Sequence, residues 1–184
     1  MDMTIPKNEP LSGLLDRLSL SGRRMRQYQI VQAGRELIRK QVWADPMKFI
    51  FSGYVYTKDP HHTPVKRLMP DKPYLRDLVT LFWKTKRLAM EKSRQVMWSN
   101  TALLYAYWLA VSTPGAEIFI RSQQKEEAIS LIDRARYAHI NLPSWLQPEL
   151  PVPVDAQHRA VFRVGNVEHE SKIMALASGP HKIR

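Results

Sequence analysis

The sequence predicts an α/β fold with a helical extension at its N-terminal end. Strand-like and helix-like segments alternate from residue 87 to residue 140, with short connections between them. Two further strand-like runs, residues 160–164 and 172–176, follow a proline-rich stretch. Residues 24–44 contain no proline and repeat apolar side chains near helical spacing. The alternation is typical of βαβ units on a parallel sheet that helices cover on both faces.

Composition narrows the class of protein. The 184 residues are 44% hydrophobic and 24% charged, which is typical of a folded globular chain. No cysteine is present, so a disulfide framework, cysteine-ligated zinc and thiol catalysis are excluded. The longest apolar run, residues 102–111, is about half the length that a membrane span requires, and the N-terminus lacks a secretory signal. We therefore expect a soluble intracellular protein without a membrane partner.

The charge balance favours a nucleic-acid partner. Lys and Arg number 28 against 17 Asp and Glu, which gives a formal net charge of +11 at pH 7. Because basic side chains that neutralise phosphates supply most non-specific affinity for DNA or RNA, a nucleic acid is the candidate partner. A solvated basic surface is the alternative. The densest basic group lies near the N-terminus and supplies the candidate DNA contacts Arg23, Arg24, Arg26, Arg35 and Arg39.

The N-terminal half divides into a leader and a helical region. Residues 1–22 carry prolines and glycines beside a leucine cluster and are interpreted as a flexible leader. Residues 23–86 are predicted to form a helical N-terminal extension, with helices over 24–44 and 74–83. Four prolines and two adjacent histidines within residues 60–73 indicate an exposed loop between these helices.

Residues 87–184 are predicted to form the α/β core. The predicted order is strand 87–91, helix 99–111, strand 117–121, helix 126–140, and strands 160–164 and 172–176. Pro114 and Gly115 end the first of these helices, and Gly165-Asn166 indicates a reversal between the last two strands.

The segment EKSRQVMWSN, residues 91–100, lies between a predicted strand and a strongly apolar helix. At such a junction, backbone N–H groups and the positive end of the helix dipole face an anion. The phosphate-loop pattern G-x-x-x-x-G-K-[ST] fits poorly, because Met97 and Trp98 take the places of its second Gly and its Lys when Ser99 is aligned. On pattern alone, a strand–loop–helix junction without a ligand is the alternative.

The residue order of this loop resembles the deviant Walker A loop of phage terminase large subunits, the ATPases that drive DNA into procapsids. In that family the phosphate-contacting lysine often starts the loop and Ser-Arg-Gln follows, as in Lys92, Ser93, Arg94 and Gln95. The segments EIFIRSQQ, KEEAISLIDRAR, INLPSWL and ESKIMALASGPHKIR resemble later segments of the family in order and spacing. The similarity spans roughly residues 45–184 and implies that residues 87–184 form a P-loop NTPase-like core with a parallel sheet.

The resemblance also implies a site, cofactors and partners. ATP would lie against Lys92, Ser93, Arg94, Gln95, Val96, Met97, Trp98 and Ser99, and the Ser99 hydroxyl would bind Mg²⁺. The complete protein would be a hydrolase of viral DNA packaging from a bacteriophage or prophage, located in the host cytoplasm. Its partners would be double-stranded DNA, a terminase small subunit and the portal, and a homo-oligomer is left open.

Two features depart from the family pattern. Met97 stands where many members carry glycine or a small residue, and a bulky side chain opposes the positive φ of a tight loop. Residues 1–184 also lack the Asp-Glu strand of Walker B, the coupling motif and the nuclease carboxylates. We therefore expect the N-terminal part of the ATPase domain, an incomplete core that contains no catalytic residue and does not turn over ATP alone. The alternatives are a degenerate or truncated DNA-binding or assembly fragment without nucleotide binding, and an unrelated basic α/β scaffold.

Aromatic residues near the loop have two interpretations. Tyr105 and Trp108 fit packing on a helix face better than stacking on bases. Trp98 lies in the loop itself, where it could stack on a ligand or wedge against the following helix.

Overall fold

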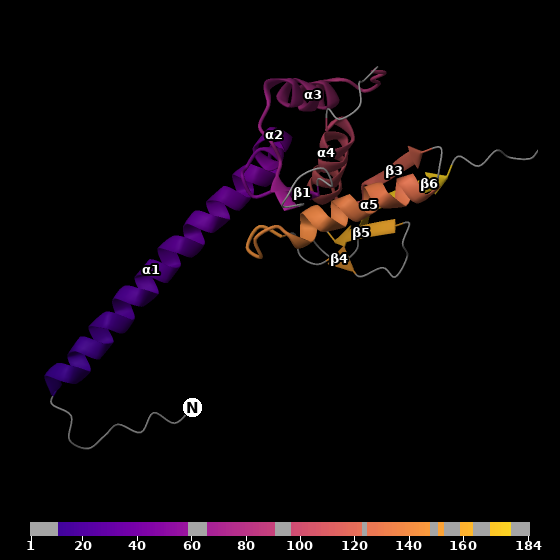
Figure 1. The fold of residues 1–184 in the computed structure, drawn as a ribbon. Helices are drawn as coiled ribbons and strands as arrows, with labels where there is room; N and C mark the ends of the chain where they lie inside the picture. The colour runs from indigo at the N-terminus through magenta and orange to yellow at the C-terminus, as the bar shows by residue number, and fades with distance from the viewer. Residues whose placement is uncertain are drawn as a thin grey trace, which may run out of the picture. The chain divides into compact units, whose positions relative to one another are not determined.

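The computed structural model describes residues 11–58, 66–90, 97–122, 125–147, 151–152, 159–163 and 170–177 (Figure 1). Within these ranges, the side chains of residues 11–21, 23, 125, 151–152, 159–163 and 177 are outside the description. The chain divides into two compact units, residues 1–38 and 39–184, and each is described by itself. Among the described residues, no helix combines the length and the apolar character that crossing a membrane requires.

Helix α1 runs from Leu11 to Trp43 and therefore begins well before the predicted start at residue 24. Residues 11–22, which we expected in a flexible leader, are helical. Gly13 and Gly22 lower helix propensity by about 1 kcal/mol each, but leucine is a strong helix former and no proline follows Pro10 within the helix. The rest of the predicted leader, residues 1–10, lies outside the described residues.

The next segment starts with a capped short helix. Helix α2 covers Pro46–Ile50, and Asp45 caps it because its Oδ1 accepts hydrogen bonds from the N–H groups of Met47 and Lys48 at 2.8 and 3.4 Å. Strands β1 (Tyr56–Lys58) and β2 (Lys66–Leu68) then form an antiparallel pair. Residues 66–68 were expected in an exposed loop, because Lys-Arg-Leu shows no apolar alternation from which a strand could be predicted.

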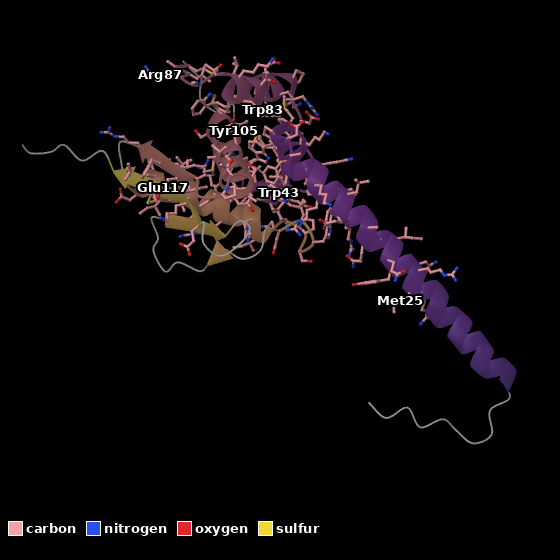
Figure 2. All side chains as sticks on the ribbon, turned by 180° about the vertical axis from the view of Figure 1, so that it is seen from behind. Met25, Trp43, Trp83, Arg87, Tyr105 and Glu117 are labelled. Atoms are coloured by element: carbon pink, nitrogen blue, oxygen red, sulfur yellow. The ribbon has the colours of Figure 1, made fainter. Side chains whose placement is uncertain are left out.

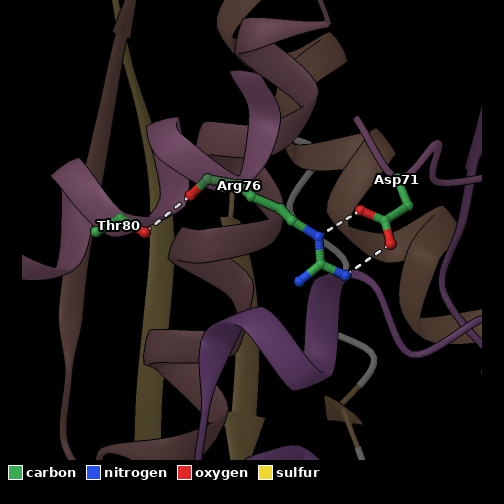
Figure 3. A network of polar contacts seen from close by, with 3 residues as sticks. All are labelled: Asp71, Arg76 and Thr80. Atoms are coloured by element: carbon green, nitrogen blue, oxygen red, sulfur yellow. Dashed lines mark hydrogen bonds and ion pairs between the residues drawn. The ribbon is translucent and has the colours of Figure 1, made fainter. Parts of the chain in front are cut away.

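Helix α3 covers Pro73–Lys84, which confirms the helix predicted over 74–83. An ion pair spans its start: both carboxylate oxygens of Asp71 accept from the guanidinium of Arg76 at 2.6 Å (Figure 3). This hydrogen-bonded pairing lowers the pKa of Asp71. The Arg76 guanidinium also lies 4.9 Å from the ring centroid of Phe51, which links α3 to the end of α2.

The sheet of the C-terminal part is mixed rather than parallel. It contains β3 (Glu117–Ser122), β4 (Pro151–Val152), β5 (Arg159–Arg163) and β6 (Glu170–Ala177) in the spatial order β3-β6-β5-β4. Among the described strands, only β3 and β6 pair in parallel, whereas β5–β6 and β4–β5 are antiparallel. The expectation of a parallel sheet is therefore wrong for two of its three strand pairs. A parallel pair needs a long crossover, and the connections around β5 are too short to provide one.

Helices α4 (Trp98–Ser112) and α5 (Lys125–Ile140) confirm the helices predicted over 99–111 and 126–140. Both helices contact the sheet and each other. Ile118 and Ile173 pair in the β3–β6 register on the face that joins the core. Phe119 and Leu176 point to the other face and are about half exposed, so in the described part of the chain helices do not cover both faces.

The strand predicted over residues 87–91 is a further correction. Residues 87–90 form no strand, and Glu91 lies outside the described residues. Leu88 and Met90 are exposed, although their alternation with Arg87 and Ala89 suggested one buried face. No described strand lies beside this segment, and without a neighbour it gains no ladder hydrogen bonds, so alternation by itself does not make it a strand.

An aromatic cluster at the centre of residues 39–184 joins four elements. Tyr107 of α4 is fully buried, with its ring centroid 6.1 Å from Trp43 and 5.7 Å from Phe49. Its hydroxyl shares a 2.8 Å hydrogen bond with Nδ1 of His139 on α5. The indole of Trp43 donates to the Leu146 carbonyl at 3.2 Å, which ties the C-terminal turn of α1 to the segment after α5. These contacts fix α4 beside α5.

We expect the stability of this cluster to depend on pH. Burial lowers the pKa of His139, so the folded protein favours the neutral imidazole. The neutral His139 contributes its full stabilisation above about pH 6.5, which is the pKa of histidine in the unfolded chain. This stabilisation is lost as the pH falls from about 6.5 through the lower pKa of His139 in the folded protein. Replacement His139→Gln should cost about 1–3 kcal/mol at neutral pH, because Tyr107 loses its partner, and should remove this part of the pH dependence. Urea unfolding of both proteins across pH 5–8 measures the difference, and parallel pH profiles would contradict the assignment.

Candidate functional site

The predicted phosphate loop leads into the N-terminus of α4. Lys92, Ser93, Arg94, Gln95 and Val96 lie outside the described residues. Met97, Trp98 and Ser99 are described and form the N-cap and the first turn of α4. The structure therefore defines the helix side of the candidate site.

Met97 has a left-handed backbone conformation, with φ 51° and ψ 16°. It is the one non-glycine residue in the described ranges with positive φ. For a side chain of this kind, the left-handed region costs about 1–2 kcal/mol. Its carbonyl accepts hydrogen bonds from the N–H and the hydroxyl of Thr101 at 3.0 and 3.1 Å. The position aligned with the second glycine of a phosphate loop thus has the φ that glycine favours, despite its bulky side chain.

The first turn of α4 has a positive electrostatic potential. The N-cap residue Met97 makes no side-chain cap hydrogen bond, and the first turn contains no acidic residue. In a helix of 15 residues, the N–H groups of this turn and the aligned peptide dipoles are equivalent to about half a positive charge. The arrangement favours an anion at the start of the helix.

Arg134 adds a full charge beside this turn and was not identified from the sequence. Its Nη1 donates to Oδ1 of the buried Asn100 at 2.8 Å, so α5 holds the beginning of α4. In the sequence Arg134 is one of several charged residues of an amphipathic helix. Since only the packing of α5 against α4 distinguishes it, no pattern in the sequence could have selected it.

Trp98 packs toward α3 and toward residue 90. Its indole Nε1 lies 3.2 Å from the sulfur of Met90, and its ring meets that of Phe82 edge to face at 5.9 Å between centroids. Ser99 follows as a half-buried residue of the first turn. Of the two interpretations of Trp98, the described contacts fit packing beside the helix.

A row of aromatic rings continues from Phe82 along α4. The ring centroid of Tyr105 lies 5.5 Å from that of Phe82 and 5.7 Å from that of Trp108. Burial raises the pKa of Tyr105. The packing role predicted for Tyr105 and Trp108 is confirmed. Trp83, labelled with Tyr105 in Figure 2, lies 6.1 Å from Trp108 and remains half exposed.

The candidate DNA contacts do not form one surface. Arg24, Arg26, Arg35 and Arg39 all lie on α1, as does Arg23, whose side chain is outside the description. Arg24 and Arg35 share one side of the helix because 11 residues complete about three turns. Arg26 lies on the opposite side. Arg24, Arg26 and Arg35 are exposed, and Arg39 is half-buried.

The described residues contain no group of three or more His, Asp or Glu side chains that could hold a metal ion. The Ser99 hydroxyl could therefore bind a cation only if the other oxygen ligands came from a bound molecule or from residues outside the described ranges. Comparison with protein-family models and with curated proteins found no match for the chain.

The conformation of Met97 gives a prediction about stability. Leu and Ile have equal volume, but a β-branched residue at positive φ is a steric outlier. We expect Met97→Leu to be nearly neutral and Met97→Ile to be less stable than Met97→Leu by roughly 1–2 kcal/mol. Thermal or urea unfolding of the two variants measures the difference. Equal stabilities would show that residue 97 does not have the left-handed conformation.

Proposed function

We propose that the chain is a terminase-type nucleotide-binding module, the N-terminal part of an ATPase that packages viral DNA. The complete enzyme would be a P-loop hydrolase acting in the host cytoplasm on double-stranded DNA, with a terminase small subunit and the portal as partners. The resemblance of residues 45–184 suggests this function, and the geometry at the start of α4 supports it.

The observation that carries the proposal is the left-handed Met97 directly before α4. A phosphate loop must turn sharply into its helix so that consecutive N–H groups face the ligand. Here the turn lies at the position that the resemblance assigns to the second glycine. A bulky residue persists in this conformation only where the surrounding structure compensates for the strain, and such sites cluster around ligands.

The described residues fit a nucleotide with a divalent cation. The start of α4 offers a first turn without a side-chain cap at Met97, the Ser99 hydroxyl and the nearby Arg134 guanidinium, and this turn contains no acidic residue that would repel phosphate. Ser99 would give its hydroxyl to Mg²⁺, and Lys92 would contact the β- and γ-phosphates as the lysine at the loop's start does in the family. When bound, ATP and Mg²⁺ would supply the phosphoryl chemistry.

We expect Lys92→Ala to weaken binding of a non-hydrolysable ATP analogue by about 1.5–3 kcal/mol, which is typical of a charge-assisted hydrogen bond. Arg94→Ala should cost less, since Lys92 has the flexible stem that reaches the phosphates from the start of the loop. Titration calorimetry measures both. Lys86→Ala is the matched control, because it removes an exposed positive charge outside the loop.

Two outcomes would contradict the proposal. No binding by the folded wild-type chain would favour the degenerate DNA-binding or assembly fragment. Binding that is indifferent to Lys92 would show that the phosphates contact another segment.

One observation favours the degenerate fragment as the second candidate: residues 87–90 form no strand, whereas the phosphate loop of the family follows one.

The arginines of α1 give a prediction about the DNA partner. Replacing Arg23, Arg24, Arg26, Arg35 and Arg39 with Gln should weaken binding to duplex DNA. The slope of log affinity against log salt should decrease by about 0.9 for each phosphate contact that is lost, because fewer counterions are released. Fluorescence anisotropy over a salt series measures both quantities. Substitution of Gln27, Gln32 and Gln41 with Ala controls for the helix, and an unchanged slope in the arginine variant would mean that these residues only face solvent.

A further inference from the structure

Helix α1 also exposes large apolar side chains, which phosphate contacts do not use. Between residues 22 and 43, six such side chains are 38–71% exposed: Met25, Tyr28, Ile30, Val31, Leu37 and Ile38. Figure 2 labels Met25 among the side chains of α1. Of these six, Tyr28, Val31 and Ile38 share one side of the helix, whereas Ile30 and Leu37 lie on the opposite side. Exposed apolar residues that share one side of a helix are typical of a protein-binding surface.

Five of the residues on α1 follow a heptad spacing. Arg24, Tyr28, Val31, Arg35 and Ile38 are separated alternately by four and three residues, as in the seam of a coiled coil. We call these five residues the seam. The next position in the same register is Val42, which is buried in the core of residues 39–184. The three apolar seam residues before it are exposed in the described part of the chain.

The charge of α1 limits what can cover the seam. Between residues 22 and 43 the helix carries Arg23, Arg24, Arg26, Arg35, Arg39 and Lys40, and Glu36 is its only acidic residue. Two of the five seam positions are arginines. In a parallel pair of α1 helices in register, each arginine would face its own copy, and burying like charges together is unfavourable. The basic seam is instead complementary to an acidic helix.

We propose that the seam binds an amphipathic helix of a partner protein. The partner would pack apolar side chains against Tyr28, Val31 and Ile38 and place carboxylates opposite Arg24 and Arg35. Duplex DNA fits these observations less well, because it buries no apolar row and contacts arginines on any side of a helix. This inference does not rest on the proposed nucleotide site.

The test uses the full chain and a synthetic three-heptad helix as the probe. The probe carries leucines at its seam positions and glutamates where they face Arg24 and Arg35, and a control peptide has lysines in place of the glutamates. We expect the acidic probe to bind, the lysine peptide to bind at least about tenfold more weakly, and affinity for the acidic probe to decrease with salt. Fluorescence anisotropy measures the binding.

Matched variants identify the surface. The double variant Arg24→Ala/Arg35→Ala removes two positive charges from the seam. Arg26→Ala/Lys40→Ala is its matched control, because it removes two positive charges from the opposite side of α1. We expect the seam pair to weaken probe binding about tenfold and the control pair to change it little. Tyr28→Ala/Ile38→Ala should weaken binding of the probe to a similar extent and leave the affinity for DNA unchanged. Circular dichroism checks the helix in each variant, since alanine favours helix formation.

Four results would overturn the inference. No binding of the acidic probe, or an equal loss from the seam pair and the control pair, would show that the apolar row has no directed partner. Self-association in sedimentation that is abolished by Tyr28→Ala/Ile38→Ala would assign the seam to a second copy of the chain. A loss of DNA affinity in the same variant would assign it to nucleic acid.

Discussion

The position of α4 depends on the burial of one side chain, Tyr107. Its ring is fully buried against Trp43 and Phe49, and its hydroxyl pairs with the buried His139. A hydroxyl that is removed from water must be hydrogen-bonded, so the pair fixes how α4 and α5 lie against each other. The same packing holds the first turn of α4, since Arg134 of α5 reaches Asn100. The geometry of the candidate site is thus a consequence of the core.

This dependence accounts for the strain at Met97. The left-handed conformation costs about 1–2 kcal/mol, which is comparable to one buried hydrogen bond. Met97 also packs partly against the core, so the contacts of its side chain offset part of that cost. A residue without such contacts would favour an ordinary negative φ. Packing therefore supports a left-handed conformation at this position without a glycine.

The sequence predicts those features that local patterns determine. Helices α3, α4 and α5 and the strands β3, β5 and β6 were predicted because apolar periodicity, Pro114 and Gly115 mark them. The prediction of a strand over 87–91 was wrong because a strand requires a neighbouring strand. The antiparallel pairing of β5 with β6 was not predicted because it depends on the length of the connection rather than on residue type. The role of Arg134 follows from packing between α4 and α5, which no local pattern encodes. The phosphate loop 92–96 is an interpretation from resemblance and remains a prediction.

A partner on the proposed seam would also stabilise α1. Trp43 and Val42 pack in or against the core of residues 39–184, whereas the described side chains from Arg24 to Leu37 are mostly exposed. Isolated helices are marginal in water, and Gly22 and Gly34 each cost about 1 kcal/mol relative to alanine. Glu36 and Lys40 offer one favourable i,i+4 pair, worth a few tenths of a kcal/mol. A docked acidic helix would bury the seam and neutralise its arginines, so binding and helix stability would be coupled in the stretch from Arg24 to Ile38.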